Sequence, residues 1–192
     1  MSLKNNSYLA GRLLLAMPQI NDPRFAKAVI FIGAHDDKGA MGIVMNNPLP
    51  VMTFKSLLDQ LNIKAGELMD PAIAGQSVLA GGPVETSRGF MIHGKDFVTN
   101  DTVQAGAFAI SGTLAALKAA AQGQGPKDLR FALGYAGWSA GQLEQEIQEN
   151  AWMVAPATHE IVFRTAPELM WSAAFAALGV NPTLISNTVG RA

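Results

Sequence analysis

Cysteine is absent from the 192 residues of this sequence. Disulfides, thiolate nucleophiles and zinc sites with sulfur ligands are therefore excluded. A surplus of charge of one sign is also missing, because 14 Lys and Arg residues stand against 15 Asp and Glu residues and the formal net charge is -1. Such a chain has no long-range field that would attract nucleic acid or anionic lipid. We therefore expect neither direct nucleic-acid binding nor membrane association.

Long apolar runs are missing too. A membrane-spanning helix needs roughly 18 uninterrupted apolar residues, and charged residues such as Arg12 and Lys55 break up the apolar segments well before that length. The sequence Asn-Asn-Ser at residues 5–7 stands where a secretory signal would be basic. We expect the protein to reside in the cytoplasm.

What the sequence has in excess is apolar character. Hydrophobic residues make up 49% of the chain and charged residues only 15%, whereas a charged share of about 25% is usual. A chain of this length suits one domain, and we find no linker, repeat or low-complexity tract. We predict a single domain over residues 1–192, with residues 1–7 as a flexible tail. The apolar surplus leaves room for a homodimer interface.

Short strands and helices alternate irregularly along the chain. Period-two and β-branched segments predict strands at residues 9–17, 29–32, 41–45, 77–80, 89–93, 107–110, 129–136, 152–154 and 160–163. Helical periodicity predicts helices at residues 54–61, 113–122, 142–151 and 169–178, and a loop is expected at residues 64–76. Ser139 with Gln142, and Thr165 with Glu168, have the form of a capping box. This mixture indicates the α+β class.

His35 heads the most polar cluster of the sequence and is followed by Asp36 and Asp37. A histidine beside carboxylates can act in acid–base catalysis or bind a divalent metal. No second ligand stands at the spacing that metal sites use, so we predict no metal site. His35 remains a catalytic candidate, with a solvated turn as the alternative interpretation.

Gly81 and Gly82 form a glycine pair after a predicted strand. Their backbone N–H groups are candidates for binding an anion, with Arg88 close enough in sequence to assist. The alternative is a tight turn that only glycine torsions allow. The loop matches neither the Walker A motif nor the dinucleotide fingerprint.

Trp138 lies among glycines at the junction between a predicted strand and a predicted helix. An indole in such a setting can serve as a stacking platform for a ligand, or it can simply pack against backbone. Gln142 and Glu146 follow on the helix and are candidate ligand-binding and acid–base residues respectively. The alternative for an acidic residue near a helix start is interaction with the helix dipole.

Taken together, four motifs in this order resemble the UPF0301 family of small bacterial proteins, also called the YqgE/AlgH family. The motifs are Gly11–Pro18 with Asp22, Pro23 and Phe25; His35 with Gly39–Asn46; Gly81–Val84; and Gly134–Glu144 with Glu146 and Trp152. The resemblance implies an α+β fold in which a mixed, partly barrel-like β-structure is surrounded by helices in a single domain. The AlgH name implies a transcriptional regulator of exopolysaccharide (alginate) production.

Two functional hypotheses follow. In the first, the protein is a non-enzymatic binding or regulatory protein that acts indirectly on transcription, through an unknown protein or small-molecule ligand. Its ligand surface would combine the glycine pair, Trp138 and Gln142, and the hairpin that carries His35 and Asn46, and no cofactor is expected.

In the second hypothesis, the protein is an enzyme or binding protein for a phosphorylated or nucleotide ligand. Gly81 and Gly82 would donate backbone N–H groups, Arg88 would hold the charge, and His35 or Glu146 would transfer protons. This hypothesis requires His35, Arg88 and Glu146 to share one cleft, because acid–base groups must reach the same reacting centre.

Overall fold

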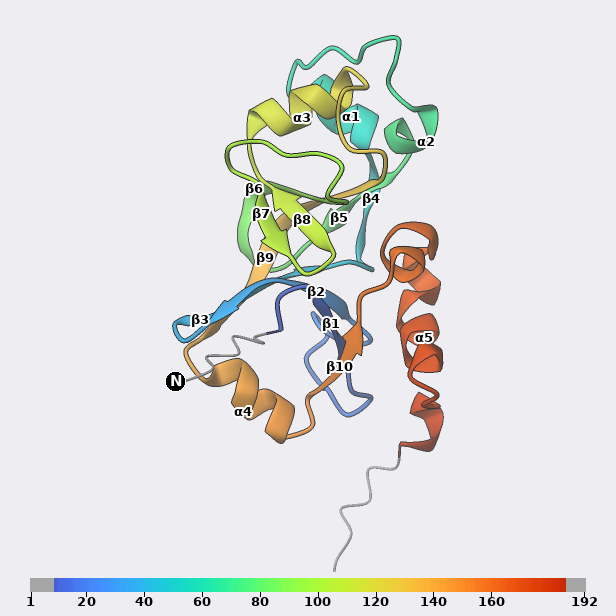
Figure 1. The fold of residues 1–192 in the computed structure, drawn as a ribbon. Coiled ribbons are helices and arrows are strands. Elements are labelled where there is room, and N and C mark those ends of the chain that lie inside the picture. Colours follow the sequence, from blue (N-terminus) through green and yellow to red (C-terminus); the bar gives the residue numbers. More distant parts are fainter. Residues whose placement is uncertain (1–8, 186–192) are drawn as a thin grey trace, which may run out of the picture.

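Strand β9 (Leu129–Ser139) is the element around which the other strands are arranged. The computed structural model describes residues 9–185. In it, β9 pairs antiparallel with β3 (Gly39–Val44) and β6 (Val84–His93), and parallel with β5 (Ser77–Ala80). One long strand therefore joins two halves of the β-structure, as Figure 1 shows.

Within the described residues the sheet is mixed and has ten strands, ordered β10-β1-β2-β3-β9-β6-β8-β7, with β4 and β5 off this path. The remaining strands are β1 (Arg12–Ala16), β2 (Val29–Asp36), β4 (Pro48–Thr53), β7 (Val103–Ala105), β8 (Phe108–Ser111) and β10 (Trp152–Pro156). The sheet curls, and helices lie around it (Figure 1). The predicted α+β class with a mixed, partly barrel-like sheet in a single domain is confirmed; the expected tail at residues 1–7 lies outside the described residues.

Three helices gather at one end of the molecule, α4 lies at the other end, and α5 runs along the side (Figure 1). Their bounds are α1 (Phe54–Gln60), α2 (Pro71–Ala74), α3 (Leu114–Ala121), α4 (Gln142–Gln148) and α5 (Pro167–Ala177), with a π-helix η1 (Glu160–Arg164) and a 3₁₀ turn η2 (Pro182–Leu184). Over residues 9–185, no helix has both the length and the apolar character that crossing a membrane requires.

Three clusters of buried side chains hold these layers together. One lies beneath α1 and α3 and includes Phe54 and Phe131. A second lies between the sheet, η1 and α5 and includes Phe31 and Phe175. The third lies between strands β1 to β3 and α4 and includes Trp138. The apolar surplus of the composition is thus largely placed inside the fold.

Local sequence signals explain several elements directly. Strands β1, β2 and β3 form the antiparallel meander that their apolar runs predict. Thr53 caps α1, because its hydroxyl accepts the backbone N–H of Ser56, and Thr113 caps α3. Gly179 follows the end of α5 with a positive φ of 67°, as a helix-terminating glycine does.

The strand predicted at residues 160–163 is wrong, because this segment is the π-helix η1. The apolar residues of this segment favour a strand by propensity, but a side chain far away in the sequence bonds to its backbone in the helical conformation. Arg130, from β9, donates hydrogen bonds to the carbonyl oxygens of Val162, Phe163 and Thr165 at 3.1–3.2 Å. These bonds satisfy backbone acceptors that a helix end leaves open.

Both predicted capping boxes are also wrong as helix caps. The N-cap residues of α4 and α5 are Gly141 and Ala166, and neither helix start receives a side-chain cap. Gln142 nevertheless bonds Ser139, whose backbone N–H donates to Gln142 Oε1 at 3.0 Å. The capping pattern therefore identified a real contact and misplaced the start of the helix.

Four short elements were not predicted from the sequence, namely α2, β4, β7 and η2. Helix α2 lies in the expected loop at residues 64–76, where Asp70 caps a single turn that begins at Pro71. Strand β4 follows β3 almost directly and pairs with β5. Proline has no N–H to give to a ladder, so the prolines at positions 48 and 50 concealed this strand.

Gly81 and Gly82 pack directly against the middle of β9. A Cβ atom at Gly81 would overlap the carbonyl oxygen of Gly134, and a Cβ atom at Gly82 would overlap the backbone of Tyr135. Gly82 also has a φ of 152°. The glycine pair is thus required where two backbones meet, and Gly82 also has a torsion that favours glycine.

We expect Gly82→Ala to lower the free energy of unfolding by about 1–3 kcal/mol, because the added methyl group meets backbone that has little room to move. Chemical denaturation measures this change. Gly137→Ala is the matched control, since the nearest atom to its Cβ, on the Tyr135 ring, is 3.5 Å away. Equal stability of the two variants would contradict the packing argument.

His93 is the one fully buried histidine of the described chain, with 0% of its surface exposed. Its Nδ1 lies 2.7 Å from the carbonyl oxygen of Gly94, so Nδ1 carries the proton and donates it. Nε2 then accepts the hydroxyl proton of Ser111 at 2.9 Å. The Ser111 oxygen lies 2.8 Å from the hydroxyl of Thr102. This network suits a neutral ring, because protonation of Nε2 would force the Ser111 hydroxyl to turn away.

Burial lowers the pKa of His93 below its ordinary value of 6.5, although Asp96 and Asp101 partly oppose this. Below about pH 6.5 the unfolded chain therefore binds a proton that the folded chain resists. We expect stability to fall as the pH is lowered from about 7.5 to 5.5, and His93→Gln to show a smaller fall. Denaturation at both pH values tests this, and an equal fall in the variant would refute it.

Candidate functional site

A cleft of about 410 Å³ lies between the loop after β1 and helix α4. We call it the α4 cleft. Its lining consists of Ile20, Asp22, Arg24, Phe25, Pro83, Val84, Ala136, Gly137, Trp138, Gln142, Glu146, Ala151 and Trp152. The volume falls in the range of small-molecule sites, and the lining combines aromatic walls with a few polar groups, as such sites do.

Glu146 accepts three side-chain hydrogen bonds at this cleft. Its Oε2 accepts the indole N–H groups of Trp138 and Trp152, both at 2.8 Å. Its Oε1 accepts the side-chain amide of Gln142 at 2.9 Å. Gln142 and Glu146 are four residues apart, which places them on the same face of α4. The carboxylate is thus fixed in position by three donors.

The two indoles form the aromatic wall of the cleft. Trp138 and Trp152 have only 7% and 6% of their surface exposed. Their ring centroids are 6.1 Å apart and the ring planes meet at 83°. Phe25 extends the wall, with its ring 5.9 Å from that of Trp152 and at 79° to it. These edge-to-face contacts stabilise the wall beyond simple burial.

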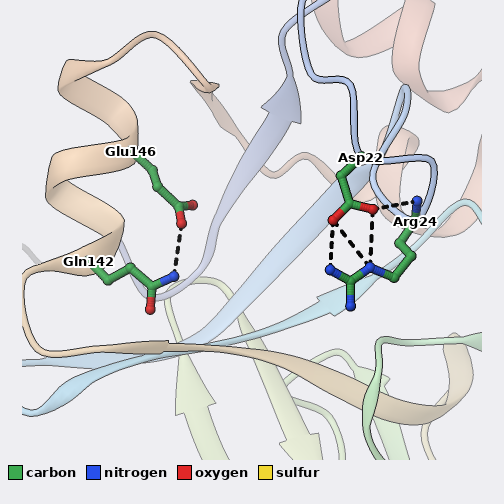
Figure 2. Close-up of polar contacts among 4 residues, drawn as sticks. All are labelled: Asp22, Arg24, Gln142 and Glu146. Atoms are coloured by element: carbon green, nitrogen blue, oxygen red, sulfur yellow. Dashed lines mark hydrogen bonds and ion pairs between the residues drawn. The ribbon is translucent and has the colours of Figure 1, made fainter.

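The opposite side of the cleft carries an ion pair. Arg24 Nη2 lies 2.7 Å from Asp22 Oδ2, and Arg24 Nε bonds Asp22 Oδ1 at 3.1 Å. Figure 2 shows Gln142 and Glu146 projecting from α4 toward the loop that holds this pair. Hydrogen bonding to Arg24 lowers the pKa of Asp22, and Asp22 raises that of Arg24. Both groups are therefore charged at neutral pH.

His35 lies outside the α4 cleft, although its side chain is only 3% exposed. Its Nδ1 accepts the backbone N–H of Leu9 at 3.1 Å, so a neutral ring must carry its proton on Nε2. Nε2 lies 2.8 Å from Glu144 Oε1 and donates to it. Both ring nitrogens are therefore engaged. The predicted solvated turn is narrower than expected, because β2 extends to Asp36.

His35 instead lines a second, more open cleft of about 570 Å³, which we call the β2–β3 cleft. Arg88 and Trp138 line it as well. Arg88 pairs with Glu85 at 3.1 Å and lies over the ring of Phe90. Glu146 lines the α4 cleft and not this one. The structure thus does not bring His35, Arg88 and Glu146 to one reacting centre.

The remaining candidate residues from the sequence are Gly81, Gly82 and Asn46. The N–H of Gly81 donates to the carbonyl oxygen of Leu133 at 2.7 Å, so it is not presented to an anion. Gly82 lines a recess of about 220 Å³ beside the α4 cleft. Asn46 accepts the N–H of Val29 and donates to the carbonyl oxygen of Lys27, both at 2.8 Å. It therefore anchors the end of the loop that carries Arg24.

Sequence reasoning found one part of the α4 cleft and missed another. Trp138, Gln142 and Glu146 were candidates, and the structure brings them together. Asp22, Arg24, Phe25 and Trp152 were not candidates. Asp22, Phe25 and Trp152 belong to the motifs that carry the family resemblance, and this membership could have identified them as candidates. Over residues 9–185, no three His, Asp or Glu side chains gather in a way that could hold a metal ion.

The fold and the cleft define an α+β protein with a curled mixed sheet and one aromatic, partly acidic cleft beside its central strand. The family model described as AlgH-like, DUF179, matches residues 13–183. A UPF0301 protein of Nitrobacter hamburgensis is 43% identical over 193 residues, covering 98% of this chain and 89% of the relative. A UPF0301 protein of Methylocella silvestris is 44% identical over 194 residues, covering 98% and 94% respectively.

Two solved structures are similar as well. The solution structure of the AlgH protein from Pseudomonas aeruginosa is 40% identical, with a TM-score of 0.76 and full coverage of both chains. A crystal structure from Corynebacterium diphtheriae shares the fold at 20% identity, with a TM-score of 0.70 over 90% of this chain and 88% of that one. The chain belongs to the UPF0301 (AlgH-like) family, and the resemblance inferred from its motifs is confirmed.

We expect Glu146→Gln to lower the free energy of unfolding by about 1.5–3 kcal/mol, because three donors lose a charged acceptor. Urea denaturation followed by tryptophan fluorescence measures the change. Glu149→Gln is the matched control on the same stretch of chain, since Glu149 is exposed and, among residues 9–185, its side chain accepts only the Gln145 amide. A Glu146 variant as stable as the control would show that the carboxylate does not hold the two indoles.

Proposed function

We propose that this protein is a non-enzymatic binding protein that takes a small molecule in the α4 cleft. Any effect on transcription would then pass through that ligand or through a protein partner. The observation that carries the proposal is the fixed geometry of Glu146 beneath two nearly buried indoles. A site whose polar and aromatic groups are held in place before the ligand arrives loses little entropy on binding.

Binding is favoured over catalysis because the candidate proton-transfer groups are already engaged. His35 uses one ring nitrogen for a backbone N–H and the other for Glu144. Glu146 accepts three hydrogen bonds from its own chain. A general base needs a lone pair within reach of the substrate proton. His35 would first have to break bonds that stabilise the fold, and Glu146 shares its cleft with neither His35 nor Arg88.

The distribution of cations favours an indirect role in regulation. Arg24, Arg88 and Arg164 pair with acidic side chains, and Arg130 is directed at backbone carbonyls. Helices α4 and α5 contain no Lys or Arg. Direct readout of DNA usually requires a basic face and an element that enters a groove. The cytoplasmic location and the homodimer remain predictions.

A thermal-shift screen of chemically diverse small molecules tests the proposal, since a ligand at 100 times its Kd adds about 2.7 kcal/mol of stability. We expect hits whose effect is lost in Phe25→Ala and Gln142→Leu. The control Arg88→Gln, in the β2–β3 cleft, should retain it. Hits insensitive to the α4-cleft variants would refute the proposal, as would salt-dependent binding of the purified protein to DNA at nanomolar strength.

A further inference from the structure

We propose that the α4 cleft recognises a compact organic cation, specifically the alkylammonium group of a small molecule. Trp138, Trp152 and Phe25 would supply the aromatic walls, and Glu146 the opposing charge. This inference rests on the proposed function and deepens it, because it names the chemical class of the ligand. It differs from the phosphorylated or nucleotide ligand that the glycine pair first suggested.

The formal charge of the lining favours a cation. Among the described residues that line the cleft, Asp22, Arg24 and Glu146 are the only charged side chains, so this lining carries a net charge of -1. Arg24 is the one group that would attract an anion, and Asp22 already holds it through Nε and Nη2. A phosphate would also meet the Glu146 carboxylate without a partner for its own charge. Like charges in a partly desolvated cleft repel strongly.

The aromatic walls suit a cation for a second reason. The planes of Trp138 and Trp152 are nearly perpendicular, and both rings line the cleft. Corners and cages of aromatic rings are the usual recognition element for alkylated ammonium groups. Both indole N–H groups point at the same Glu146 oxygen. Donation to a carboxylate polarises the indoles and makes their π faces more negative.

The cleft already stabilises one organic cation of its own. The guanidinium of Arg24 lies 5.6 Å from the ring centroid of Phe25 and is paired with Asp22. This is the combination of aromatic face and carboxylate that the ligand would find at Trp138, Trp152 and Glu146. Within the described residues, Glu146 Oε1 accepts only the Gln142 amide. A carboxylate can accept about four hydrogen bonds, so Glu146, which lines the cleft, keeps the capacity to accept one from a ligand.

Choline and its uncharged isostere 3,3-dimethylbutan-1-ol have nearly the same shape, but only choline carries a positive charge. Comparing them separates the contribution of charge to binding from that of shape. We would titrate each, and inorganic phosphate, into the full-length protein and follow the three indole N–H signals by NMR. We expect choline to shift the signals of Trp138 and Trp152. Trp171, whose indole donates to the carbonyl oxygen of Ala16, serves as an internal control. The isostere should bind at least about tenfold more weakly, which corresponds to the loss of the cation–π and charge contributions.

Two variants test the role of the carboxylate and of the ring. Glu146→Gln should weaken choline binding about tenfold or more, and Glu149→Gln should not change it. Phe25→Leu removes a ring and keeps an apolar side chain, so it should also weaken binding. Because Glu146→Gln can lose stability, the salt dependence of choline binding to the unmodified protein is a second measurement. Binding should weaken as ionic strength rises.

Equal binding of choline and its isostere would overturn the inference, as would shifts of Trp138 and Trp152 caused by phosphate and not by choline. These outcomes are distinct from a failure of the proposed function. If neutral or anionic compounds from the screen shift the two indoles and choline does not, the cleft binds ligands of another class. If no compound shifts either indole, the ligand-binding proposal fails as well.

Discussion

The close approach of two backbones, at Gly81–Gly82 and Gly134–Tyr135, is the constraint on which the rest of the structure depends. At this point β9 changes partners, from β5 and β6 on one side to β3 on the other. Side chains here would force the two halves of the sheet apart. The positive φ of Gly134, 76°, lets the strand continue through the junction, which glycine does at little steric cost.

The α4 cleft forms because β9 continues through this junction. Because β9 continues past the junction, it delivers Trp138 to the far half of the sheet, just before α4 begins. Helix α4 then places the Glu146 carboxylate within hydrogen-bonding distance of the Trp138 indole. Strand β10 starts with the second indole, that of Trp152. A segment of the chain only fifteen residues long therefore builds one wall of the cleft. The other wall, with Asp22 and Arg24, comes from the loop that precedes β2.

Those features that depend on local sequence could be predicted. The β1–β3 meander, the capped helices α1 and α3, and the grouping of Trp138, Gln142 and Glu146 all follow from short-range patterns. Features that depend on distant contacts could not. The π-helix η1 forms around Arg130, which lies some thirty positions earlier in the chain. The ion pair in the cleft was not predicted, because nothing near Arg24 in the sequence shows that α4 faces it. Local propensity is routinely overridden in this way.

The carboxylate of Glu146 also connects two strands of the sheet. Two indoles donate to the same oxygen, so neither ring can shift without straining the bond of the other. One indole belongs to the central strand of the sheet and the other to β10, which stands at the end of the strand order. A single side chain therefore connects the middle of the sheet with its edge. The edge of a sheet is where another polypeptide can add a strand, and in this protein the edge strand β10 is joined to the cleft by the hydrogen bond from Trp152 to Glu146.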